Sequence, residues 1–141
     1  MKMTLEPKKK DRKKFDIDLA YGKVREDSIK DMLQNKKIEV KSERDVWQKT
    51  GNIAIEYESY GKPSGIAATE ADYWFHNLCV GKKTYATLVF EVDSLKEILE
   101  SLPNKISVKG GDHFASRMYL INLQKLFDIK TIKEYVNIKW I

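Results

Sequence analysis

Cysteine, proline and long apolar stretches are scarce in this chain of 141 residues, which holds one cysteine and three prolines. The single cysteine, Cys79, cannot form an intramolecular disulfide, and it excludes a zinc site built from paired cysteines. No run of about 18 apolar residues is present, so the sequence predicts no transmembrane helix. The first residues also lack the apolar core of a secretory signal. We therefore expect a protein of the reducing cytoplasm.

The chain contains enough apolar material for one core, because 42% of its residues are hydrophobic and 11% are aromatic. Its length suits one ordinary domain. The charged fraction of 33% predicts a well-solvated surface. No linker-like segment interrupts residues 15–141, so we expect a single domain there.

The net charge of +5 is concentrated at one end of the sequence. Residues 1–14 hold seven of the 26 basic and two of the 21 acidic residues, which leaves 19 of each sign in the remainder. Such a segment is often a flexible basic arm that binds phosphate groups. A solvated leader without a partner explains the same composition equally well.

Apolar periodicity predicts a mixed α/β domain with a central sheet flanked by helices. The spacing indicates helices over 21–34, 69–78 and 94–102, and strands over 37–43, 52–59, 84–92, 106–109 and 118–121. The first two strands are separated by a loop-like segment, 44–51, and should form an antiparallel hairpin. The apolar run over 84–92 is typical of a central strand that is buried on both faces.

Charged residues gather on one face of each of the first two predicted strands. Glu39, Lys41 and Glu43 share a face of the first strand, and Glu56 and Glu58 share a face of the second. If the aliphatic faces of both strands join the core, the charged faces coincide, with cross-strand neighbours about 5 Å apart. The sequence therefore predicts several carboxylates and one lysine on a shared patch.

Such a patch is electrostatically unfavourable alone, because neighbouring carboxylates raise each other's pKa and lower stability. A divalent cation relieves this repulsion, and Mg²⁺ typically uses one or two carboxylates together with substrate phosphate. A nearby lysine can orient a metal-bound water. Glu26, at the edge of the apolar stripe of helix 21–34, could complete the site. A solvated sheet face with modest cross-strand Glu–Lys pairs is the competing interpretation.

The segments GKVRE around Glu26, KIEVKS around Glu39 and Lys41, and NIAIEYES around Glu56 resemble the PD-(D/E)XK nuclease superfamily. This group includes restriction endonucleases and archaeal-type Holliday junction resolvases. The resemblance covers about residues 15–92, and the stretch 50–74 also looks like small nuclease-like phage proteins. It implies a restriction-endonuclease-like fold and a Mg²⁺-dependent or Mn²⁺-dependent deoxyribonuclease, located in the host cytoplasm if a phage encodes it.

Two assignments of the superfamily motif are open. In the preferred one, Glu39 replaces the usual aspartate, and Glu56-Tyr57-Glu58 is the (D/E)-x-K element with Glu58 in the place of the lysine. Lys41 is then a lysine that has moved to the adjacent strand. In the other, Glu39-Val40-Lys41 is itself the element, and its partner acid is Asp27 or Asp31.

The resemblance implies roles for five residues in the preferred assignment. Glu39 and Glu56, together with Glu58, would hold the metal. Glu58 and Lys41 would position the attacking water, and Glu26 would assist from behind the metal ligands.

Candidate DNA contacts lie in the loops that follow each of the two strands. Trp47 in the 44–51 loop is expected to be exposed and could stack on bases, although packing over the sheet edge is equally compatible. Ser64 in the turn GKPSGI could approach a phosphate. Arg44, Lys49 and Lys62 are suitable phosphate contacts, with a solvated face as the alternative for each.

Asp72 and His76 are four residues apart on the predicted helix 69–78, a spacing that could ligate a metal. We instead interpret Asp72 as a helix-capping acid and His76 as a surface histidine.

Two other functions compete with the nuclease. One is a catalytically inactive DNA-binding module of the same fold, which the missing lysine after Glu56 favours. The other is an interaction protein that binds no nucleic acid. A domain of this size cannot encircle DNA, so a nuclease that cuts both strands is expected to act as a homodimer.

Overall fold

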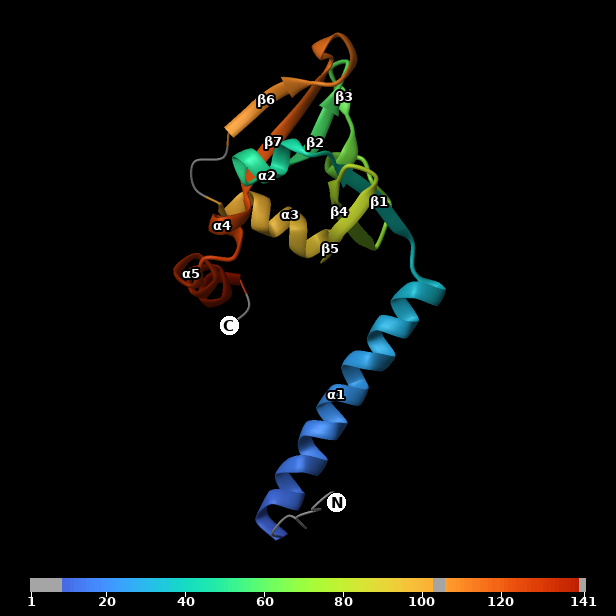
Figure 1. Cartoon of the computed structure of the whole chain (residues 1–141), viewed down its shortest axis with the longest axis vertical. Coiled ribbons are helices and arrows are strands. Elements are labelled where there is room, and N and C mark those ends of the chain that lie inside the picture. The colour runs from blue at the N-terminus through green and yellow to red at the C-terminus, as the bar shows by residue number, and fades with distance from the viewer. Residues whose placement is uncertain (1–8, 103–105, 140–141) are drawn as a thin grey trace. The chain divides into compact units, whose positions relative to one another are not determined.

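The computed structural model describes residues 9–102 and 106–139, and it divides the chain into two units, Met1–Lys36 and Lys37–Ile141. The described part of the first unit is one helix, α1 (Lys9–Asn35), shown in blue in Figure 1. This helix is longer than the predicted 21–34 and begins at Lys9. Residues 9–14 of the predicted flexible arm are therefore helical, and residues 1–8 lie outside the described residues. The division between units falls after Lys36 rather than after residue 14.

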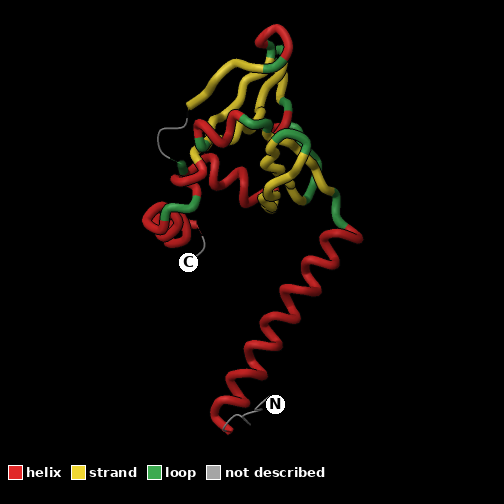
Figure 2. The backbone as a smooth tube through the Cα atoms, viewed as in Figure 1, coloured by secondary structure: helices red, strands yellow, loops and turns green. Residues whose placement is uncertain are grey.

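The second unit is a mixed α/β fold with two sheets in its described part. The three-stranded sheet has the order β1 (Ile38–Glu43), β4 (Tyr73–Val80), β5 (Lys83–Glu91). The four-stranded sheet has the order β3 (Lys62–Pro63), β2 (Asn52–Ser59), β7 (Ser116–Asn122), β6 (Ile106–Gly110). The predicted α/β class is confirmed, but the strands form two sheets rather than one central sheet (Figure 2).

Helical segments connect these strands. They are α2 (Val46–Thr50), α3 (Val92–Ser101), α4 (Leu123–Leu126), α5 (Ile129–Lys139), and the 3-10 turns η1 (Gly65–Ala67) and η2 (Asp112–Phe114). Among the helices that the structure describes, none is long and apolar enough to span a membrane.

The predicted hairpin of the first two strands is wrong. β1 pairs in parallel with β4, whereas β2 pairs with β3 and β7 in the other sheet. The intervening segment is not a hairpin loop, because residues 46–50 form α2. Gly51 ends that helix at φ 72°, where its amide donates to the Trp47 carbonyl, and the chain leaves toward the second sheet.

The predicted helix over 69–78 is also wrong, because residues 73–80 form β4, the central strand of its sheet. Trp74, His76 and Leu78 are buried and alternate with half-buried residues, which is the period of a strand rather than a helix. Asp72 does not cap a helix, since its carboxylate accepts a hydrogen bond from the Lys37 amide at 3.0 Å.

The strands predicted over 84–92, 106–109 and 118–121 are all present as β5, β6 and β7. β5 is an edge strand, however, and its residues alternate between exposed and half-buried, so it is not buried on both faces. The last predicted helix, 94–102, is α3, which begins two residues earlier at Val92.

The core lies where α3 meets both sheets. Its least exposed apolar residues are Ile53 and Ile55 of β2, Trp74 of β4, Leu95 of α3 and Ile121 of β7, each at most 2% exposed. Burying one such aliphatic side chain contributes about 1.5–3 kcal/mol. The core therefore holds the two sheets and α3 together.

Replacing Leu95 with Ala should destabilise the protein by about 2–5 kcal/mol, because the buried side chain leaves a cavity at the junction of α3 and the sheets. Lys96→Ala, at an exposed position on the same helix, should change stability by no more than about 0.5 kcal/mol. Denaturant unfolding of both variants measures the difference. Equal destabilisation by the two substitutions would contradict the described packing of α3.

Candidate functional site

The polar face of β1 points into the molecule. Glu39 lies opposite Trp74 of β4, and Lys41 lies opposite His76. Residues directly opposite each other project from the same face of a sheet, and both of these β4 residues are buried. Glu39 and Lys41 therefore lie on the same side of the sheet as the buried Trp74 and His76.

The aliphatic face of β1 lies on the other side. Val40 is 56% exposed, so the condition that the aliphatic face of the first strand joins the core is not met at this residue. The alternation itself was correctly identified, but alternation alone does not say which face is buried. The charged faces of β1 and β2 still approach each other, now from two sheets rather than from one hairpin.

A cavity of about 250 Å³ lies between the two sheets at this point. Its lining comes from β1, β2, β4 and β7, namely Lys41, Ser42, Glu43, Ala54, Glu56, Trp74, His76 and Met118. The structure thus brings Lys41 and Glu56, two of the predicted site residues, to the lining of one cavity.

Hydrogen bonding favours the ionised form of Glu56. Bonds from Ser116 and Ser64 lower the pKa of Glu56 below its ordinary value of 4.5, and the charge of Lys41 adds to this effect against the opposing effect of burial. Ser64 Oγ donates to Glu56 Oε2 at 2.7 Å. Gly65 allows this contact, because it has φ 53° and a Cβ there would collide with the Glu56 carbonyl oxygen.

Lys41 interacts with acids on both strands. Its Nζ lies 3.0 Å from Glu39 Oε1 and 5.9 Å from the centroid of the Trp74 ring, within cation–π range. Its charge also lowers the pKa of Glu56. Lys41 is therefore paired with Glu39 on its own strand and has a smaller electrostatic effect on Glu56 of the other sheet.

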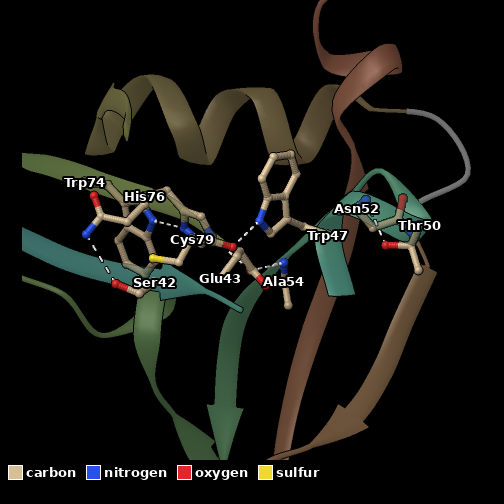
Figure 3. A network of polar contacts seen from close by, with 10 residues as sticks. Ser42, Glu43, Trp47, Thr50, Asn52, Ala54, Trp74, His76 and Cys79 are labelled. Atoms are coloured by element: carbon tan, nitrogen blue, oxygen red, sulfur yellow. Dashed lines mark hydrogen bonds and ion pairs between the residues drawn. The ribbon is translucent and has the colours of Figure 1, made fainter. Parts of the chain in front are cut away.

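A hydrogen-bonded chain that the sequence did not reveal lies beside this group (Figure 3). Trp74 Nε1 donates to His76 Nδ1 at 3.1 Å, so the proton of the neutral imidazole resides on Nε2. His76 Nε2 then donates to Glu43 Oε1 at 2.9 Å. The same oxygen accepts the Ala54 amide at 2.5 Å.

The prediction of a surface histidine at position 76 is wrong, since His76 is only 1% exposed. The error follows from the helix assigned to 69–78. Four residues along a strand span about 13 Å, so Asp72 and His76 are not placed as a metal-binding pair. The alternation of Trp74, His76 and Leu78 is the signal that could have identified a buried strand face.

Glu58 does not line the cavity and pairs with an arginine of β7 instead. A bulge in the β2–β7 pairing separates it from Glu56, and its Oε2 pairs with Arg117 Nε at 3.1 Å. The described lining of the cavity does not include Glu58.

Glu26 belongs to the first unit, where it is exposed on α1 and pairs with Lys30 at 3.2 Å. The acids of the other motif assignment lie on the same helix. Asp27 pairs with Lys23 at 3.4 Å, and Asp31 accepts a hydrogen bond from Asn35.

Of the predicted DNA contacts, Trp47 is not an exposed stacking residue. Its Nε1 donates to the Cys79 carbonyl at 2.8 Å, and its ring packs against the core with Tyr85 5.9 Å away. Arg44, Lys49 and Lys62 are exposed, as a phosphate contact requires.

A larger and more open hollow of about 580 Å³ adjoins the cavity. Glu39 and Ser64 line this hollow, whereas their partners Lys41 and Glu56 line the cavity. Lys37 lines the hollow with a positive charge, and Glu70 lines it with a negative charge in addition to that of Glu39. Glu39 is therefore reachable from a surface depression, and its partner Lys41 lines the cavity.

Within the described ranges, no three His, Cys, Asp or Glu side chains are grouped so that they could hold a metal ion by themselves. Of the predicted metal ligands, Glu39 lines the open hollow and Glu56 lines the cavity. The chain matches no family model, no curated protein and no solved structure.

Ser64→Ala should lower stability by about 1 kcal/mol at neutral pH, because it removes a hydrogen bond to an ionised carboxylate. Since the folded pKa of Glu56 is depressed, its contribution is fully present above the unfolded value and is lost as the pH falls through the folded pKa. The difference between wild type and Ser64→Ala should therefore shrink in acid. Urea unfolding at successively lower pH measures it.

Ser101→Ala is the matched control, because that hydroxyl donates to a backbone carbonyl and its loss should cost the same at every pH. A pH-independent effect of Ser64→Ala would refute the account of Glu56.

Proposed function

We propose that this protein is a metal-dependent DNA endonuclease of the PD-(D/E)XK type, which hydrolyses phosphodiester bonds with Mg²⁺ or Mn²⁺. The observation that supports it best is that Lys41, which pairs with Glu39 on its own strand, lines the same cavity as Glu56 of the other sheet. Two carboxylates and one amine are groups that metal-assisted hydrolysis of a phosphodiester can use.

The geometry favours Glu39-Val40-Lys41 as the (D/E)-x-K element, with Glu56 as the second carboxylate. Glu39 and Lys41 share a face of β1, and their side chains are in contact. Glu58, which the preferred sequence assignment placed in the role of the lysine, is engaged by Arg117. Asp27 and Asp31 are not needed as partners, because β2 supplies Glu56. We extend this proposal to a restriction-endonuclease-like fold for the chain.

Each residue has a defined task in this proposal. Glu39 and Glu56 hold the metal, which when bound activates water and stabilises the charge on the leaving oxygen. Glu56 is suited to this because its lowered pKa keeps it ionised. Ser64 fixes one Glu56 oxygen. The Lys41 ammonium orients the water and faces the charge that develops on the phosphate.

DNA is the proposed partner, since exposed Arg44, Lys49 and Lys62, together with Lys37 in the open hollow, provide phosphate contacts. A second candidate function is DNA binding without cleavage. It is favoured by the close Glu39–Lys41 ion pair, in which the carboxylate already balances the charge of the ammonium group. It is also favoured by the lack of a group of three metal-binding side chains in the described residues.

Lys41→Ala and Glu56→Ala should each lower the cleavage rate roughly 10²- to 10³-fold, which is typical for removal of one charge-stabilising group. DNA binding should persist, because the exposed basic residues remain. The assay uses the full chain with Mg²⁺ or Mn²⁺ on plasmid, linear and branched DNA, with gel retardation for binding.

Glu58→Gln is the control and should keep the rate within a few-fold, because Glu58 lies outside the cavity lining. Unchanged cleavage by Glu56→Ala would reject this site. Salt-sensitive DNA binding without cleavage in the wild type would select the second candidate.

A further inference from the structure

An unpaired backbone edge lies between the two sheets. On the edge of β2 that faces away from β7, β3 pairs only with Glu58 and Ser59. Ala54, further along this edge, donates its amide to the Glu43 carboxylate instead of to a strand. A backbone amide shielded from water needs such an acceptor, so this bond replaces the missing strand partner.

Glu43 is itself oriented from the opposite side. Its side chain is 19% exposed, and its Oε1 accepts both the Ala54 amide and His76 Nε2. Trp74 fixes the imidazole tautomer that makes this donation, and His76 is 1% exposed. As Figure 3 shows, the chain from Trp74 through His76 and Glu43 ends on Ala54 of the other sheet.

The position of this link along the strands connects it to the candidate site. Glu43 comes two residues after Lys41 on β1, and Ala54 comes two residues before Glu56 on β2. Both pairs line the same cavity. Since two residues along a strand span only about 7 Å, a bond between one pair constrains the distance between the other.

We propose that Glu43 is a positioning residue, whose Oε1, oriented by His76 and Trp74, joins β1 to the backbone of β2 and so holds Lys41 opposite Glu56. Its catalytic consequence rests on the proposed nuclease function, whereas the link between the sheets does not. Glu43 acts through the reach of one acceptor oxygen rather than through its charge, because both bonds converge on that oxygen.

Three substitutions of Glu43 distinguish the effect of its side-chain length from the effect of its charge. Glu43→Gln keeps an oxygen at the same distance without the charge, so it should retain the link and cleave within about threefold of wild type. Glu43→Asp keeps the charge but shortens the side chain, and Glu43→Ala removes the oxygen. Both should lower kcat roughly 10- to 100-fold, as a displacement of about 1 Å does, with KM for DNA unchanged.

The opposite order, with Glu43→Asp active and Glu43→Gln as impaired as Glu43→Ala, would assign Glu43 a charge-dependent role and overturn the proposal. Thr87→Val is the control, because it removes a hydrogen bond to Asn77 at an exposed position on β5.

Hydrogen exchange tests the link without any cleavage assay. The Ala54 amide should exchange at least about tenfold faster in Glu43→Asp and Glu43→Ala than in wild type, with protection retained in Glu43→Gln and Thr87→Val. Unchanged Ala54 protection in Glu43→Asp overturns the proposal whatever the enzyme assay shows. A wild type that cleaves no DNA contradicts only the nuclease function, and the Ala54 exchange then still decides whether the link exists.

Discussion

Polar residues of β1, β2 and β4 line the place where the two sheets of the second unit meet. The candidate site depends on each of these polar groups having a hydrogen-bond partner. A polar group that is shielded from water without a partner costs about 1–3 kcal/mol, so each buried donor and acceptor between the sheets needs a hydrogen-bond partner. Among the described residues, every buried side-chain nitrogen and oxygen has one. The Ala54 amide, the Glu43 carboxylate and the His76 imidazole satisfy one another, which fixes how β1 faces β2.

Elements with a strong local signal were predictable from the sequence. β2, β6 and β7 follow from alternation or from the Gly110-Gly111 turn, and α3 follows from its helical spacing. The residues of β4 were wrongly predicted to be helical, because Trp74, Phe75 and Leu78 are also spaced as on one face of a helix. Its strand state comes from pairing on both sides with β1 and β5, which no local pattern contains.

The site was predictable to the extent that it depends on alternation within a strand. Glu39 and Lys41 share a face of β1, and Glu56 of β2 lines the same cavity as Lys41, although the pairing expected for these strands is not present. The prediction that Glu58 belongs to the site is not supported, because a bulge interrupts the alternation that would place it on the same face as Glu56. The role of His76 could not be found, because it depends on the strand assignment of β4 and on a contact with Glu43 in a different part of the chain.

The structure also changes the electrostatic argument for a cation. Neighbouring carboxylates destabilise a fold only when nothing else neutralises them. Here Lys41 pairs with Glu39, two donors bind Glu43, and serine hydroxyls bind Glu56. The chain can therefore hold these acids in place without a metal. Repulsion between them is no longer an argument for Mg²⁺, and the proposal of a metal depends on Glu39 at the open hollow and on Glu56 at the cavity.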